Sequence, residues 1–151
     1  MVDQKLAQTF CLRDGRLIGY AEFGDPEGFP VVYCHGFPAS RLEGGLLDAA
    51  ARRQRVRVIA ADRPGYGLSA WQADRAMTDW PDDISQLLAH LGIERFAVLG
   101  VSGGGPYGLS LLAKLADRVV AASFVCPLGP VYQPELVQAM HWPARLGFVS
   151  A

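Results

Sequence analysis

The chain has 151 residues, half of them hydrophobic and 19% charged, with a formal net charge of -1. This length and composition are typical of one globular domain and exclude a disordered chain. No basic stripe is present, which argues against nucleic acid as a partner, and the longest apolar run, residues 119–126, is too short to cross a bilayer.

Three cysteines without a CxxC spacing, Cys11, Cys34 and Cys126, indicate buried reduced thiols rather than a disulfide framework or a metal site. Residues 1–8 lack the apolar core of a signal peptide, and we expect a cytoplasmic protein.

Six apolar runs predict strands, and three segments between them predict helices. The strands are expected at residues 9–13, 16–23, 31–34, 56–61, 96–99 and 119–125. The helices are expected at residues 41–53, 79–91 and 106–116. In the second helix, apolar residues recur at helical spacing up to Leu91, and Gly92 follows as a stop. Asp14 and Gly15 form a two-residue turn signal, so the first two strands are expected to pair as a hairpin.

This alternation predicts the fold class, α/β, with a mostly parallel sheet and helices on both faces. In such sheets, ligands bind beside the carboxyl ends of the strands. Three distinctive segments directly follow predicted buried strands, and they begin at His35, Asp62 and Gly100. We therefore expect these segments to meet at one edge of the sheet and to form the functional site.

The segment Gly100-Val101-Ser102-Gly103-Gly104 lies between a predicted strand and a predicted helix. A serine on such a strained turn is lifted clear of the sheet, and glycine two positions before and after it removes side-chain clashes. The N-terminus of the following helix directs amides and partial positive charge at the reacting centre. A phosphate-binding glycine loop is the alternative, but the pattern GxxxxGK[ST] is absent. Ser102 is therefore the candidate nucleophile.

These three segments, in this order, resemble motifs of the α/β-hydrolase superfamily, especially of its cap-bearing, serine esterase-like members. Residues 35–38 (HGFP) match the HGxP loop after the third strand, and residues 62–69 (DRPGYGLS) match the DxPGxGxS segment after the fourth. Residues 100–104 match the nucleophile elbow after the fifth strand. The resemblance covers about residues 10–130. Within it, residues 62–69 are interpreted as structural, because their glycines and proline turn the chain beside the pocket.

The resemblance implies roles for five residues. Ser102 would attack the carbonyl carbon of the substrate, and the backbone amides of Phe37 and Gly103 would form the oxyanion hole. His35 and Gly36 would shape and support the oxyanion loop, and His35 would not be the catalytic base. A serine nucleophile favours hydrolysis of an ester, thioester, lactone or amide through an acyl-enzyme, whereas relatives that open epoxides or displace halide use aspartate. The implied partner is a small ester-like molecule, no cofactor or metal is implied, and the oligomeric state is left open.

The rest of the catalytic triad does not follow the family pattern. In this fold an acid and then a histidine follow the serine along the chain. After Ser102 the sequence holds two acids, Asp117 and Glu135, and one histidine, His141. Asp117 precedes its strand and is interpreted as a loop charge, while Glu135 and His141 lie where the helical cap usually begins. His90, within a predicted helix, is assigned no role.

The missing acid and histidine predict a truncated hydrolase. Residues 1–130 are expected to form the N-terminal part of the core, with the sheet ending after its sixth strand, and residues 131–151 are expected to begin a helical cap. Such a sheet would expose an apolar edge, and these residues alone are expected to turn over activated esters little or not at all. Two alternatives stay open: a non-catalytic protein that binds a small apolar ligand, and lyase or perhydrolase chemistry on the same scaffold.

Overall fold

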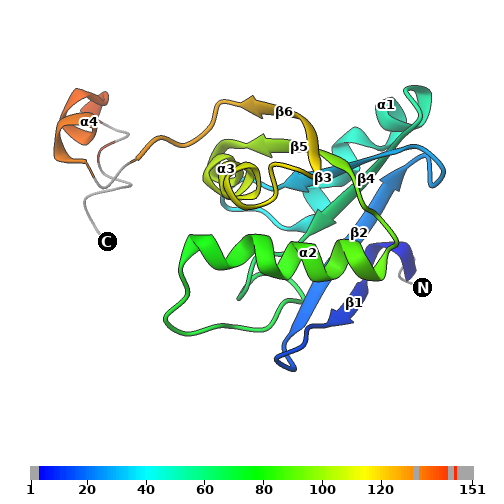
Figure 1. Ribbon diagram of the computed structural model, residues 1–151. Coiled ribbons are helices and arrows are strands. Elements are labelled where there is room, and N and C mark those ends of the chain that lie inside the picture. The colour runs from blue at the N-terminus through cyan, green and yellow to red at the C-terminus, as the bar shows by residue number, and fades with distance from the viewer. Residues whose placement is uncertain (1–3, 131–132, 143–144, 146–151) are drawn as a thin grey trace.

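The computed structural model describes residues 4–130, 133–142 and 145. Within them, six strands form one sheet in the order β1-β2-β4-β3-β5-β6 (Figure 1). Their bounds are β1 Gln8–Cys11, β2 Leu17–Gly24, β3 Phe29–Cys34, β4 Val56–Ala61, β5 Phe96–Val101 and β6 Val119–Val125. β2 pairs antiparallel with β1 and β4, whereas β4, β3, β5 and β6 run parallel. The predicted mostly parallel sheet is confirmed.

Helices cover both faces of this sheet, as predicted. The α-helices are α1 Asp48–Arg53, α2 Trp80–His90, α3 Gly105–Lys114 and α4 Pro134–Ala139, and 3-10 turns occupy η1 Gln4–Leu6, η2 Arg41–Leu47, η3 Met77–Asp79 and η4 Ser102–Gly104. Leu87 of α2 and Leu111 of α3 belong to one buried cluster, and Ala51 of α1 belongs to another. The adjacent β3 residues Val32 and Tyr33 enter different clusters. Because side chains alternate along a strand, the two clusters lie on opposite faces of the sheet.

The helix predicted over residues 41–53 forms in two pieces, a 3-10 segment, Arg41–Leu47, followed by α1. Gly44 accounts for the close approach of the first piece to β2. A β-carbon at Gly44 would come within 3.0 Å of the Phe23 ring, so a larger side chain would push this segment away from the sheet. The sequence did not reveal this approach, because it depends on a ring that lies 21 residues away along the chain.

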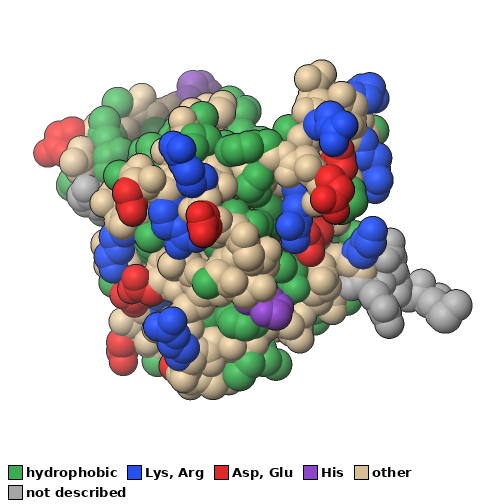
Figure 2. Space-filling view, turned by 45° about the vertical axis from the view of Figure 1, so that its right-hand side comes forward, with side chains coloured by type: hydrophobic (Ala, Val, Ile, Leu, Met, Phe, Trp, Pro, Cys, Tyr) green, Lys and Arg blue, Asp and Glu red, His purple; other side chains and the backbone are tan. Residues whose placement is uncertain are grey.

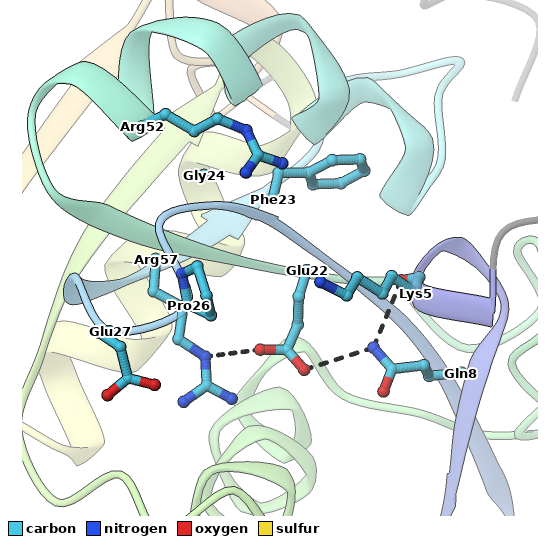
Figure 3. A pocket seen from close by; sticks show the side chains of 9 residues that line it. All are labelled: Lys5, Gln8, Glu22, Phe23, Gly24, Pro26, Glu27, Arg52 and Arg57. Atoms are coloured by element: carbon cyan, nitrogen blue, oxygen red, sulfur yellow. Dashed lines mark hydrogen bonds and ion pairs between the residues drawn. The ribbon is translucent and has the colours of Figure 1, made fainter.

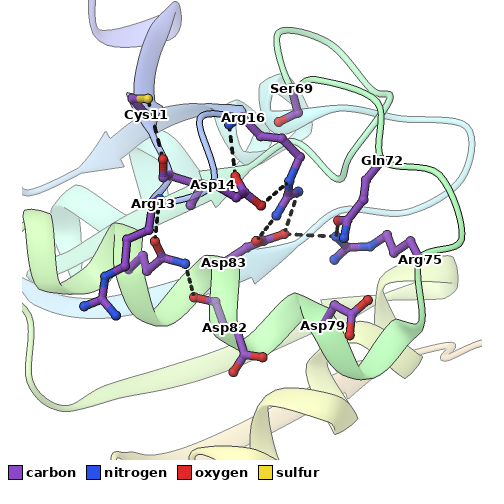
Figure 4. A network of polar contacts seen from close by, with 12 residues as sticks. Cys11, Arg13, Asp14, Arg16, Ser69, Gln72, Arg75, Asp79, Asp82 and Asp83 are labelled. Atoms are coloured by element: carbon purple, nitrogen blue, oxygen red, sulfur yellow. Dashed lines mark hydrogen bonds and ion pairs between the residues drawn. The ribbon is translucent and has the colours of Figure 1, made fainter.

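A buried carboxylate fastens the loop between β4 and α2. Asp83 of α2 accepts a hydrogen bond from Arg16, which precedes β2, at 2.6 Å and one from Arg75, within the loop, at 2.9 Å (Figure 4). Asp83 is only 2% exposed, and two cationic partners offset the cost of burying its charge. The network holds in place the loop that begins at Asp62.

β6 forms an open edge of the described sheet. Val120 and Val125 are 43% and 49% exposed, and no described strand pairs with the outer side of β6. Figure 2 shows hydrophobic side chains at the surface among charged ones. The expected apolar edge after the sixth strand is therefore observed. The boundary near residue 130 and a cap over 131–151 stay predictions, and much of that segment lies outside the described residues. No helix in the described part of the chain has the length and apolar character needed to cross a membrane.

The cysteines depart in part from the predicted burial. Cys34 in β3 is buried, and burial raises the pKa of its thiol to about 12. Cys11 and Cys126 are exposed, which corrects the expectation for both. Cys11 ends β1 and Cys126 follows β6, the two outer strands, where no further described strand covers them. All three cysteines are free thiols.

Candidate active site

The three loops that carry the predicted site meet beside the carboxyl ends of the parallel strands. β3 lies between β4 and β5 and runs parallel to both, so the carboxyl ends of these three strands lie side by side. The loop after β4 contacts the other two loops. The backbone N–H of Arg63 donates to Nε2 of His35 at 3.4 Å, and the Arg63 side chain donates to the carbonyl of Gly103 at 3.1 Å. The predicted convergence of the three segments is confirmed.

Ser102 lies at the junction between β5 and the helical turn that leads into α3. Its φ is +48°, a left-handed conformation that residues other than glycine rarely adopt. A β-carbon at Gly104 would lie 2.7 Å from the carbonyl oxygen of His35, and one at Gly100 would lie 2.9 Å from the ring of Phe124. The strained serine and its two flanking glycines therefore have the geometry of a nucleophile elbow.

Phe37 and Gly103, whose amides are expected to form the oxyanion hole, are neighbours in space. A β-carbon at Gly103 would lie 3.5 Å from the backbone nitrogen of Phe37 and 3.1 Å from its β-carbon, so a larger residue would crowd the Phe37 side chain. A β-carbon at Gly36 would lie 3.6 Å from the β-carbon of Ser102. The structure thus brings Ser102 and the HGFP loop (residues 35–38) together, as the sequence predicted.

His35 lies beneath this loop and is 1% exposed. Its Nδ1 lies 3.0 Å from the carbonyl oxygen of Gly36, and its Nε2 accepts from the backbone N–H of Arg63. These partners assign the proton to Nδ1. Burial, and to a lesser degree the nearby Arg63 cation, lower the pKa of His35 and favour the neutral ring. Both ring nitrogens are used within the scaffold, in keeping with a supporting position.

The other titratable residues considered for a triad lie elsewhere. Asp117 is exposed in the turn before β6, at the edge of the sheet opposite to Ser102. Glu135 in α4 and His141 just after it are exposed, and no hydrogen bond joins them. His90 is exposed at the end of α2. Among the residues that the structure describes, the Ser102 hydroxyl has no hydrogen-bond partner, so this part of the chain offers the serine no base.

Asp62 begins the loop after β4 and is fully buried. Its Oδ2 accepts from Nη1 of Arg41 at 2.7 Å and from the backbone N–H of Leu68 at 2.9 Å, while its Oδ1 accepts from the backbone N–H of Arg41 at 2.7 Å. A β-carbon at Gly67 would collide with this carboxylate, which explains a glycine at a φ of +50°. These contacts all lie within the scaffold and support the structural interpretation of residues 62–69.

Two charged residues that contact the HGFP loop were not identified from the sequence. Glu43 in η2 accepts from the backbone N–H of Gly36 at 2.7 Å and from the hydroxyl of Tyr33 at 2.9 Å. Burial and the bond to Glu43 raise the pKa of Tyr33, so the phenol stays protonated. Arg63 donates to the carbonyl of Gly36 at 2.8 Å. The sequence shows only that Arg63 lies within the DRPG segment and that Glu43 follows the HGFP segment. Such a position is a weak indication of a role in the site.

Gly103, Gly105 and Gly108 also have the GxGxxG spacing of dinucleotide-binding loops. This spacing alone therefore does not distinguish a nucleophile elbow from a dinucleotide-binding loop. The structure explains the second and third glycines by packing. A β-carbon at Gly105 would lie 2.5 Å from the β-carbon of Pro127, and one at Gly108 would lie 2.8 Å from the ring of Phe124. Both glycines let α3 approach β6 and the loop after it.

A polar cavity of about 320 Å³ lies apart from this site, beside β2 and α1 (Figure 3). Glu22 in its wall pairs with Arg57 at 2.5 Å and accepts from the amide of Gln8 at 3.4 Å. Ser102 does not line this cavity. Because Glu22 and Arg57 form an ion pair and the cavity lies apart from Ser102, we assign it no role in the chemistry.

Comparison with known proteins identifies the family. The family model for the alpha/beta hydrolase fold matches residues 30–148. The chain is 33% identical over 138 residues to the dihydrolipoyllysine-residue acetyltransferase component of the acetoin cleaving system of Pseudomonas putida, covering 91% of this chain and 35% of that protein. It is 37% identical over 107 residues to a probable proline iminopeptidase of Streptomyces coelicolor, covering 64% and 32%. The chain thus spans about a third of the length of these curated relatives.

Solved structures agree with this assignment. A thermophilic esterase from Thermogutta terrifontis superimposes with a TM-score of 0.70 at 26% identity, covering 87% of this chain and 50% of that one. A hydrolase from Pseudomonas aeruginosa superimposes with a TM-score of 0.77 at 21% identity, covering 98% and 59%, and supports the fold. With the family model, the sheet order and the elbow in agreement, this chain belongs to the alpha/beta hydrolase fold family.

Proposed function

We propose that this chain carries the nucleophile and the oxyanion hole of a serine hydrolase that acts on a carboxylic ester or a related acyl substrate. The observation that carries this proposal is the left-handed backbone of Ser102 at the end of β5, next to the loop that holds Phe37. Similarity to an esterase of known structure supports the substrate class. The proposed partner is a small ester-like molecule, and the proposed chemistry uses no metal or cofactor. The free thiols support a cytoplasmic location.

The proposed reaction passes through an acyl-enzyme. Oγ of Ser102 attacks the carbonyl carbon of the substrate, and the electron pair of the carbonyl moves onto its oxygen. The N–H groups of Phe37 and Gly103 donate to this oxyanion, whose charge exists only near the transition state. During the attack the proton of the Ser102 hydroxyl passes to a base. Collapse of the intermediate expels the alkoxide, which takes this proton from the base and leaves as the alcohol, so that an ester remains on Ser102. Water then hydrolyses this ester and restores the serine.

The base and the acid are the incomplete part of this proposal. A serine hydroxyl needs a neighbouring base to become a strong nucleophile, and the Ser102 hydroxyl has no partner in the described part of the chain. We therefore assign the histidine and its acid to polypeptide outside these 151 residues. The short coverage of the curated relatives, about a third of their length, supports this assignment.

Exogenous imidazole tests both parts of the proposal. Hydrolysis of p-nitrophenyl acetate by the purified 151-residue protein should stay close to the rate of its Ser102→Ala variant. Added imidazole should supply the missing base and produce a rate that rises above that of the variant at the same imidazole concentration. Equal rates for the two proteins at every imidazole concentration would overturn the role of Ser102. Robust, Ser102-dependent turnover without imidazole would overturn the assignment of the base to other polypeptide.

A non-catalytic binding protein is the second candidate, favoured by the Ser102 hydroxyl, which has no hydrogen-bond partner among the described residues. Such a protein would keep the elbow as a scaffold and hold a small apolar ligand without turnover. A fluorophosphonate probe with imidazole present separates the two candidates, since it labels an activated serine. Labelling lost in Ser102→Ala supports the hydrolase, whereas an unlabelled protein supports the binding function.

A further inference from the structure

Arg63 is a buried cation with no anionic partner among the residues that the structure describes. It is 5% exposed, and no described carboxylate forms an ion pair with it. Its guanidinium carbon lies 4.7 Å from the ring centre of Tyr66 and 4.9 Å from that of Tyr107, and its buried Nε has no hydrogen-bond partner. Burying an unpaired charge is costly, and cation–π contacts offset only part of that cost. Packing contacts alone therefore do not account for a buried guanidinium at this position.

The guanidinium joins the two loops that carry the proposed oxyanion donors. Nη2 donates to the carbonyl of Gly36 at 2.8 Å, and Nη1 donates to the carbonyl of Gly103 at 3.1 Å. Arg63 comes from the loop after β4, whereas its acceptors follow β3 and β5. A rigid, planar fork with several donors can hold two separate carbonyls in fixed relative positions, which a lysine cannot do equally well.

The bond to Gly36 acts directly on an oxyanion donor. The carbonyl of Gly36 and the N–H of Phe37 belong to one planar peptide group and point in opposite directions. Fixing the carbonyl therefore fixes the direction of the N–H. A cationic donor also draws electron density from the carbonyl, which makes the N–H on the same peptide a stronger donor. Glu43 holds the N–H of Gly36 at 2.7 Å, so Gly36 is held on both sides.

We propose that Arg63 is a positioning residue that sets and polarises the Gly36–Phe37 peptide and ties it to Gly103, so that the oxyanion hole is formed before substrate binds. This inference rests on the proposed function. It adds a residue that fixes the position of the oxyanion donors, which the nucleophile and the two amides do not do themselves. The buried positive charge also favours the negative charge that develops beside Gly103 in the transition state.

An NMR measurement tests the geometry without any catalysis. The amide ¹⁵N resonance of Phe37 reports the hydrogen bond to the carbonyl that precedes it. In Arg63→Ala this resonance should move upfield, because the charged donor is lost, and Arg63→Lys should give a smaller movement. Arg75→Ala is the matched control: the Arg75 side chain is only 11% exposed and also lies over an aromatic ring, but it pairs with Asp83. If the ¹⁵N resonance of Phe37 shifts no more in Arg63→Ala than in Arg75→Ala, the inference is wrong.

The imidazole-dependent hydrolysis described above tests the chemical consequence. Arg63→Ala should lower the Ser102-dependent rate at least about tenfold, less than the roughly 100- to 1000-fold expected for losing an oxyanion donor itself. Arg63→Lys should be intermediate, and methylguanidinium should partly restore Arg63→Ala but not Arg75→Ala. A purely structural Arg63 would show no such rescue. If Arg63→Ala does not fold, Arg63→Lys decides the outcome. In that variant the ¹⁵N resonance of Phe37 should still move upfield and the Ser102-dependent rate should still fall.

The two proposals can fail separately. Absence of any Ser102-dependent hydrolysis in the wild-type protein would overturn the proposed function, while the Phe37 resonance would still decide the position of Arg63. An unchanged Ser102-dependent rate in folded Arg63→Ala would overturn the inference and leave the proposed nucleophile intact.

Discussion

Ser102 stands between two regions of opposite character. Towards β3 and β4, the loops are closed and densely bonded: Gly36 is held through both its N–H and its carbonyl, and His35 uses both ring nitrogens. Towards β6, the surface is open, with Val125 and Cys126 exposed. The region that would stabilise negative charge is therefore built by residues of this chain that the structure describes. The groups that would activate the serine are absent from the described part of the open region.

This contrast indicates which residues should be sensitive to substitution. Changes in the closed region should cost stability, because they break buried bonds or collide with neighbouring backbone. Changes on the β6 side should cost little, because the affected side chains already face solvent.

The largest effect is expected for Arg41→Met, which leaves the buried Asp62 carboxylate without its cation. Arg41 and Asp62 are 8% and 0% exposed, and their ion pair is 2.7 Å long. Removing one member of such a pair typically costs about 3–5 kcal/mol in the free energy of unfolding. Urea denaturation measures this loss. Arg52→Met, which breaks an exposed pair with Asp48, is the control and should lose only a small fraction as much.

Gly104→Ala should come next. The added β-carbon would approach the backbone carbonyl of Cys34, the last residue of β3, and that of His35, which follows it. We expect a loss of about 2–3 kcal/mol in the free energy of unfolding, typical of forced overpacking. Gly129→Ala is the control, because a β-carbon there meets nothing within 4 Å. Equal stabilities of the two variants would contradict the close approach of the elbow to β3.

A smaller effect is expected from pH through His35. Burial lowers the pKa of His35 in the folded chain below its ordinary value of 6.5, so the unfolded chain binds a proton first as the pH falls. Stability should therefore be unaffected by His35 above about pH 6.5 and should fall as the pH drops towards the lowered pKa. Denaturation curves at pH 7.5 and 5.5 measure the change. His35→Gln should reduce it, and the exposed His90→Gln should not.

The smallest effect on stability is expected on the β6 side. Val125→Lys places a charge on a side chain that is 49% exposed, so the free energy of unfolding should change by less than about 0.5 kcal/mol. A lysine on an open edge also opposes pairing with another chain. Sedimentation velocity at rising concentration should show less self-association than for the wild-type protein. A large loss of stability would mean that β6 is covered in solution.

The positions of the strands along the chain and the elbow could be predicted from the sequence, because local signals specify both. The order of the strands within the sheet was not predicted, because it depends on contacts between distant segments. Apolar runs with flanking glycine or proline mark β3, β4 and β5, and the glycines around Ser102 mark the turn. The burial of Cys11 and Cys126 was predicted wrongly, since an apolar strand looks the same at the edge and at the centre of a sheet. The close approach of the first piece of residues 41–53 to the distant Phe23 ring also left no sign in the sequence.

Arg63 and Glu43 could not be assigned from the sequence for a different reason. Their partners become neighbours only after β3 inserts between β4 and β5, so no spacing along the chain reveals the contacts. A charge beside a glycine-rich loop is usually a solvated one. Only the burial of Arg63 and its two carbonyl acceptors separate it from that common case.

Mass spectrometry of the acylated protein tests the central claim, that Ser102 is a nucleophile held in a preformed oxyanion site. The 151-residue protein is incubated with p-nitrophenyl acetate and imidazole, quenched in acid and digested. We expect a single acetyl group on the peptide that contains Ser102, and this group should be lost in Ser102→Ala and reduced in Arg63→Ala. Acetylation confined to lysines, or unchanged in Ser102→Ala, would contradict it.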